Sequence, residues 1–152
     1  MTKLIDWYNL IVGAVIAVLS NIFGPYWQVF IFYLLFNVLD YLTRWIAARR
    51  TKTEESAKAE TGIYKKVSLW VLILVAFSAG YILTMLVNDI FGGNINLLYI
   101  GWVVLGMLMI NEIRSICENL IDAGVEVPAI ISKGLKVAES VINSEEGDSN
   151  ND

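Results

Sequence analysis

Long stretches without a single charged residue limit what this chain can fold into. Residues 7–39, 67–88 and 95–111 contain no Asp, Glu, Lys or Arg. The hydrocarbon core of a bilayer is about 30 Å thick, and a helix of about 20 apolar residues crosses it. The second stretch is long enough by itself. The third is long enough if Asn94 and Glu112 lie near the headgroups. The sequence therefore predicts an all-α integral membrane protein.

The first stretch is too long for one span. As a single helix, residues 7–39 would be about 50 Å long at 1.5 Å per residue. Ser20-Asn21 and Gly24-Pro25 supply turn residues near its middle, which predicts a tight helical hairpin. We therefore expect a bundle of four transmembrane helices within residues 1–120, at about 4–23, 26–48, 64–91 and 95–120. The alternative is three spans, with the first segment at the interface or re-entrant, because Asp6, Asn9 and Asn21 weaken it.

Cations predict the orientation of these helices. They cluster in the connection between the second and third helices: Arg44, Arg49, Arg50, Lys52, Lys58, Lys65 and Lys66. Short loops rich in Lys and Arg stay on the cytoplasmic side. The other two connections carry no cation, so this loop and, with four spans, both termini are expected on the cytoplasmic side of the membrane.

The residue types argue against an enzyme. The chain has one cysteine, Cys117, and no histidine. Imidazole or thiolate metal sites and nucleophile–histidine pairs are therefore excluded. We expect no catalytic residue, no metal, no cofactor and no nucleic-acid partner.

Polar residues inside the apolar helices are the candidates for function. Asp40 and Arg44 lie four residues apart, so they share a helix face and can pair. Charges within a membrane tend to face the bundle, a partner or water. The pair could be structural, with Arg44 reaching to the interface, or it could line a seam between helices that is sometimes wet. Arg114 is expected as a further partner of Asp40, with Glu112 competing for it. The seam candidates are Asn37, Asp40, Thr43, Arg44, Glu112 and Arg114.

Small residues mark the expected helix contacts. Such residues let membrane helices approach closely. The candidates are Gly13, Ala17, Gly80, Gly101 and Gly106. Packing within one chain and packing between copies explain them equally well.

The segment after the last span is amphipathic and then acidic. We expect a cytoplasmic amphipathic helix within residues 121–143, with Pro128 suited to a helix start. It could lie on the membrane surface, pack on a neighbouring subunit or cover the bundle's own cytoplasmic end. Residues 144–152 are polar enough to form a disordered tail.

Two segments resemble the toxin-secretion and phage-lysis holins. The first contains Asp40, Thr43 and Ala47-Ala48 and closes with Gly62-Ile63-Tyr64-Lys65-Lys66. The second contains Glu112, Ser115-Ile116, Glu118-Asn119, Gly124 and Pro128. Arg44 stands where the family pattern has a small residue. The resemblance covers residues 25–140.

The resemblance implies a homo-oligomer that contacts membrane lipid and forms pores or lesions in the bacterial inner membrane. An endolysin or a large toxin would leave the cell through them, in cytolysis or in toxin secretion. Two alternatives remain from the residues themselves. One is a small ion channel or transporter with a path past Asp40, and the other is a non-conducting membrane scaffold.

Overall fold

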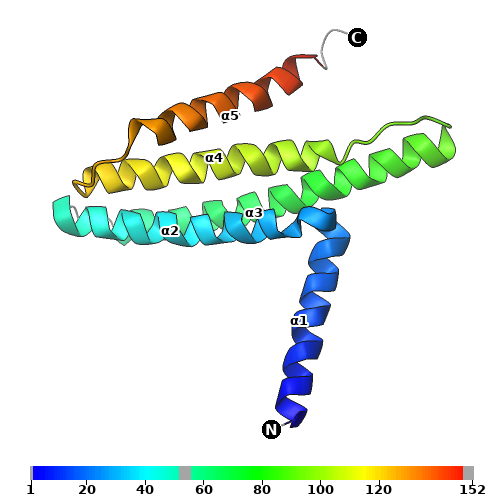
Figure 1. Ribbon diagram of the computed structural model, residues 1–152, viewed down its shortest axis with the longest axis horizontal. Helices are drawn as coiled ribbons and strands as arrows, with labels where there is room; N and C mark the ends of the chain where they lie inside the picture. The colour runs from blue at the N-terminus through cyan, green and yellow to red at the C-terminus, as the bar shows by residue number, and fades with distance from the viewer. Residues whose placement is uncertain (1, 52–55, 149–152) are drawn as a thin grey trace.

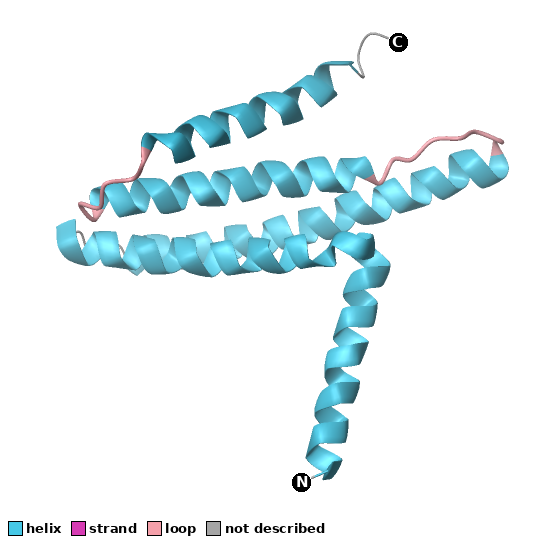
Figure 2. Cartoon of the chain, viewed as in Figure 1, coloured by secondary structure: helices cyan, strands magenta, loops and turns pink. Residues whose placement is uncertain are grey.

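The described part of the chain folds into five long helices. A computed structural model describes residues 2–51 and 56–148. The helices are α1 (Thr2–Phe23), α2 (Trp27–Thr51), α3 (Ser56–Met85), α4 (Tyr99–Asp122) and α5 (Ala129–Asp148). A short 3-10 turn, η1 (Gly24–Tyr26), joins α1 to α2, and a π-helical turn, η2 (Leu86–Ile90), extends α3. The described ranges contain no strand (Figure 2), and the all-α prediction is confirmed.

Within residues 2–51 and 56–148, three helical stretches are long and apolar enough to cross a membrane: Asp6–Thr51, Tyr64–Ile90 and Tyr99–Asp122. The membrane class predicted from the sequence is therefore confirmed. The first stretch has 46 residues, which corresponds to about 69 Å of helix, far more than one bilayer. It bends at η1, where Gly24 has φ 65°. The bend lies where the Gly24-Pro25 turn was expected, whereas the count of four spans stays a prediction.

The helices form a bundle around α4, from which α1 projects. Helix α4 packs against α2, α3 and α5. The last of these runs back along α4, and α1 leaves the bundle at a steep angle to α2 (Figure 1). Residues 6–18 of α1 are all exposed in the single chain. The tight hairpin expected between the first two helices is therefore a corner instead, because η1 turns the chain without folding α1 back onto α2.

The buried core lies at the η1 end of the bundle. It consists of Phe23, Phe30, Tyr33, Ile73, Phe77 and Leu105. The Phe23 and Phe30 rings stack with centroids 4.5 Å apart, and the Phe77 ring meets Phe23 edge-on at 4.9 Å. Aromatic pairs in these geometries are stabilised beyond their area burial. The core therefore joins α1, α2, α3 and α4 at one level.

Two connections differ from their predicted bounds. Helix α3 begins at Ser56 rather than at residue 64, because the segment before Tyr64 is rich in the helix formers Ala, Lys and Glu. Helix α4 begins at Tyr99 rather than at residue 95. The Asn88 side chain donates to Ile95 O at 2.8 Å and accepts from Ile95 N at 2.9 Å. These two hydrogen bonds hold Ile95 beside Asn88, so the segment before α4 is not helical.

The C-terminal region also differs from expectation. Helix α4 ends at Asp122, and Gly124 follows it with φ 76°. Helix α5 then begins directly after Pro128, so residues 121–143 do not form one helix. Helix α5 reaches Asp148, past the point where a disordered tail was predicted to begin. The rest of that tail, residues 149–152, lies outside the described residues.

Candidate functional site

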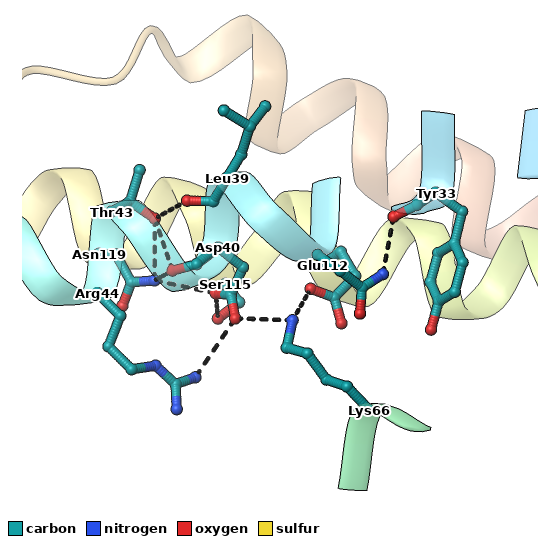
Figure 3. Close-up of polar contacts among 10 residues, drawn as sticks. Tyr33, Leu39, Asp40, Thr43, Arg44, Lys66, Glu112, Ser115 and Asn119 are labelled. Carbon is teal, nitrogen blue, oxygen red and sulfur yellow. Dashed lines mark hydrogen bonds and ion pairs between the residues drawn. The ribbon is translucent and has the colours of Figure 1, made fainter. Parts of the chain in front are cut away.

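Asp40 is the centre of a buried polar cluster between α2, α3 and α4. Its side chain is 3 % exposed. One carboxylate oxygen, Oδ1, accepts hydrogen bonds from Ser115 Oγ and from Asn119 Nδ2, the latter at 3.0 Å. The other, Oδ2, lies 3.0 Å from Lys66 Nζ and 3.6 Å from Arg44 Nη2 (Figure 3). Both oxygens of this buried carboxylate therefore have partners.

Lys66 joins two carboxylates that lie far apart in sequence. Its Nζ forms ion pairs with Asp40 of α2 and with Glu112 Oε2 of α4 (Figure 3). The Lys66 side chain is 22 % exposed, and that of Glu112 is 10 % exposed. A buried charge without a partner is strongly destabilising, so each of these groups depends on the others. With Arg44 included, two cations balance two anions.

Asn119 and Thr43 extend the cluster toward the end of α2. Asn119 Nδ2 also donates to Thr43 Oγ1 at 3.2 Å. The Thr43 hydroxyl in turn donates to Leu39 O at 2.9 Å. The hydroxyl proton is thus used for a hydrogen bond within α2, and the hydroxyl oxygen can still accept a hydrogen bond from α4. The Asn119 amide therefore links α4 to both Asp40 and Thr43, which lie one turn apart on the same face of α2.

Asn37 and Tyr33 continue the polar line in the opposite direction, one helical turn at a time. Asn37 Nδ2 donates to Tyr33 O at 2.7 Å. Tyr33 is fully buried and Asn37 is 4 % exposed. The Tyr33 hydroxyl and Asn37 Oδ1 have no hydrogen-bond partner among the described residues. The line thus passes from a fully paired cluster to two unpaired buried atoms.

The structure brings five of the six seam candidates to this face of α2 and α4. Arg114 is the exception, and its predicted pairing with Asp40 is wrong. Arg114 Nη2 lies 2.7 Å from Glu139 Oε2 of α5, and both side chains are 42 % exposed. Residues two apart on a helix point about 200° from each other at 3.6 residues per turn. Arg114 therefore cannot face the same seam as Glu112.

The predicted small-residue contacts divide into two groups. Gly80, Gly101 and Gly106 lie at close approaches within the chain. A Cβ at Gly101 would lie 2.5 Å from the Phe77 ring, one at Gly80 2.5 Å from Leu97 O, and one at Gly106 3.1 Å from Ile142 Cδ1. Gly13 has nothing within 4 Å of such a Cβ, and Ala17 is exposed. These two residues of α1 make no close helix contact within the described chain.

Sequence reasoning did not assign Lys66, Ser115, Asn119 or Tyr33 to the site. A spacing signal for three of them was present. Glu112, Ser115 and Asn119 are spaced i, i+3 and i+7, which places them on one face of α4. Tyr33 shows a similar spacing from Asn37 and Asp40. Lys66 gave no such signal, because its partners lie on other helices.

The cluster suits holding helices together or conducting through a wet seam. Among the residues that the structure describes, no three His, Cys, Asp or Glu side chains gather as a metal site. Arg44 lies at the outer edge of the cluster, and its side chain is 48 % exposed in the single chain. Charged groups placed in this way within membrane helices mark ion or water pathways, or pairings that hold a bundle closed.

An apolar helical bundle with a buried, charge-balanced seam defines a small membrane protein whose polar residues lie between its helices. Comparison with known proteins narrows this class. The sequence profile of the bacteriophage holin family matches residues 17–140. The chain is also 32 % identical over 107 residues to a "Probable holin" of Bacillus phage phi105, covering 70 % of this chain and 71 % of that protein. The chain belongs to the bacteriophage holin family.

Family membership suggests a phage-type former of membrane lesions for lysis, located in the cell membrane. The family consists of non-enzymatic membrane proteins that oligomerise and act with endolysins. The comparison with solved structures gave no significant match.

Proposed function

We propose that this chain is a holin that assembles into homo-oligomers in the bacterial inner membrane and opens lesions there. An endolysin, or a large toxin, leaves the cell through these lesions. In this proposal, α1 swings into line with the bundle in the membrane, away from the steep angle it has in the single chain. Four helices then span the membrane, and both termini lie in the cytoplasm, on the side of the cation-rich connection between α2 and α3. Family membership supports the activity, and the distribution of cations supports the orientation.

The buried ion cluster is the observation from which we assign a role in this function to particular residues. Asp40, Lys66 and Glu112 are held between three helices of an otherwise apolar bundle. In the closed protomer these three groups and Arg44 neutralise one another. On assembly the seam opens, and Asn37, Asp40, Thr43, Arg44 and Glu112 become wet. Their charges are then stabilised by water and no longer by each other, so the same residues support both states.

Helix α1 supplies a surface for contacts between copies. Its residues 6–18 are exposed, and Gly13 and Ala17 lie one turn apart on it. Small residues at this spacing allow a helix of a second copy to approach closely. Lipid covers the same face before assembly. Crosslinking through Cys117, which is half-buried on α4, before and after collapse of the membrane potential would report the change in packing.

Inducible expression in a bacterial host tests the lesion activity. Wild-type chain should collapse the membrane potential and, in cells that also make an endolysin, cause lysis. Asp40→Asn should change the time of onset because Asp40 is buried in the cluster. The matched variant Asp89→Asn should leave the onset unchanged, because Asp89 is exposed in η2. A membrane potential that stays intact at high expression, with and without endolysin, would refute the proposal.

The same cells distinguish two other functions. A small ion channel gives a selective current that is sharply reduced by Asp40→Asn, and it retains proteins inside the cell. A scaffold that recruits a partner loses its activity when residues 144–152 are deleted. A holin keeps lesion formation after that deletion and changes only its timing.

A further inference from the structure

Helix α5 packs along α4 at a level that belongs to the membrane span of α4. Arg114 Nη2 of α4 lies 2.7 Å from Glu139 Oε2 of α5. Further along α5, the Ile142 side chain reaches Gly106, where an added Cβ would lie 3.1 Å from the Ile142 Cδ1 atom. Gly106 lies within residues 95–111, which contain no charged residue. Docked α5 therefore extends from the end of this span toward its middle (Figure 1).

The sequence of α5 after Ile142 makes this depth costly in a bilayer. The helix continues to Asp148, which is about 9 Å further along its axis. The residues of this last part read NSEEGD. Charged side chains are costly within the hydrocarbon and almost always face other helices or water there. A docked α5 is therefore not compatible with lipid around this face of α4.

Helix α5 has a wider apolar face than the part that α4 covers. Seven apolar residues fall within a sector of about 160° when plotted at 100° per residue: Ile130, Ile131, Leu135, Val137, Ala138, Val141 and Ile142. At one edge of this sector, Leu135, Ala138 and Ile142 are half-buried. Toward the other edge, Ile130 and Val137 are 73 % and 63 % exposed. Packing on α4 thus buries only one edge of the apolar face.

The opposite side of α5 is polar and carries two cations. Lys133 and Lys136 are exposed there, as is Ser132. A helix with a broad apolar face and cations on its polar side lies in the membrane interface, with its apolar residues just below the headgroups. A flat lipid surface covers the whole apolar face of such a helix at once. Another helix would cover one edge only, as α4 does.

Helix α4 ends correctly without help from α5. Gly124 N donates to Ile121 O at 2.8 Å, and Val125 N donates to Leu120 O at 2.9 Å. The ion pair between the two helices is half-exposed, since both of its side chains are 42 % exposed, and such pairs contribute little to stability. Helix α5 can therefore separate from α4 while α4 stays intact.

We propose that α5 is a membrane-surface helix. When α4 lies in a bilayer, α5 leaves α4 and lies parallel to the membrane, with its apolar face in the lipid and with Lys133 and Lys136 among the phosphate groups. The arrangement with α5 docked on α4 is the one adopted without lipid. This proposal requires only that α4 crosses the membrane, so it is independent of the lesion activity.

Depth measurements with spin labels in lipid vesicles test this orientation. Full-length protein carrying Cys117→Ser and one added cysteine, Ile130→Cys or Val137→Cys, is labelled and reconstituted at low protein density. The vesicles contain phosphatidylglycerol and phosphatidylcholine. Saturation of the label signal in the presence of oxygen and of a water-soluble nickel complex measures each depth. Ser132→Cys, on the polar side of α5, is the matched control.

A surface helix places the labels at residues 130 and 137 at the same shallow depth, just below the phosphates, and the label at residue 132 in water. A helix that stays on α4 places label 137 deeper than label 130 by about 10 Å, and this result overturns the proposal. Water accessibility at 130 and 137 equal to that at 132 also overturns it. Protection of 130 and 137 that is lost on dilution with lipid would assign this face to a second copy and contradict the proposal.

A second measurement needs only the label at residue 130. Val137→Glu places a carboxylate on the apolar face and should move that label into water, whereas Ser132→Glu should leave its depth unchanged. Both positions are exposed in the docked chain, so thermal unfolding in detergent should be the same for the two variants. Equal depths of label 130 in the two variants overturn the proposal. Lesion formation is measured separately by solute release, and its absence leaves these depths unchanged.

Discussion

Replacing Lys66 by methionine removes the cation that two buried carboxylates share. Lys66 Nζ lies 3.0 Å from Asp40 Oδ2, and at an effective dielectric constant of about 20 this attraction is about 5.5 kcal/mol. Desolvation and the 22 % exposure of Lys66 reduce its net effect. Removing one partner from a buried ion pair typically destabilises a protein by about 3–5 kcal/mol. Arg44 still neutralises Asp40 in part, so we expect the lower value of that range for Lys66→Met.

Unfolding by denaturant in detergent micelles, followed by tryptophan fluorescence, measures this change. Trp27 and Trp102 pack against the buried core and report its loss. Lys65→Met is the matched control. Lys65 is exposed and forms no ion pair with another described residue, so its replacement should change the free energy of unfolding by less than about 0.5 kcal/mol.

A compensating variant tests the electrostatic reasoning itself. Lys66→Met together with Glu112→Gln leaves one anion and one cation in the cluster, Asp40 and Arg44. Charge balance is restored, so more than half of the lost stability should return. If Lys66→Met differs from Lys65→Met by less than about 1 kcal/mol, the cluster behaves like an exposed ion pair, and the proposed role of the seam is wrong.

Three further substitutions test separate contacts. Gly101→Ala should destabilise the bundle by about 1–3 kcal/mol through overpacking against the Phe77 ring, whereas Gly13→Ala should not be destabilising; thermal unfolding in detergent compares them, and equal midpoints would contradict the close approach. Asn119→Ala removes hydrogen bonds to the α2 face and should lower the free energy of unfolding by about 1–3 kcal/mol; a change near zero would mean that water replaces the amide. Arg114→Gln breaks a half-exposed ion pair and should have an effect below about 1 kcal/mol; a larger loss would show that α5 depends on that pair.

Much of the fold was predictable because its signals are local. A run of residues without charge specifies a membrane helix, and Gly24-Pro25 specifies where the first run bends. The Asp40–Arg44 contact also follows from spacing, and the structure confirms it at 3.6 Å. Each of these features depends on residues that are neighbours along one helix.

The centre of the site was less predictable because it depends on how helices pack. Lys66 and Glu112 are 46 residues apart, and no periodicity within either helix shows that they meet. Arg114 was assigned to Asp40 by its position near the end of α4, but the direction of a side chain around the helix, not its height, decides what it faces. The direction of α1 depends on the backbone conformation at η1. The turn residues show where the chain bends but not in which direction α1 leaves the bundle.

Of the described residues of α1, Phe23 is fully buried in the aromatic core, and Leu19 and Ile22 pack beside it, while residues 6–18 are exposed. The exposed N-terminal part of α1 lies within reach of lipid or of another copy, and the Phe23 ring at its other end lies in the core. A tilt of the exposed part of α1 would therefore displace Phe23 before any other buried side chain. Rotation of this helix would move that ring away from Phe30 and Phe77. A contact between α1 and another copy would in this way change the packing of the core.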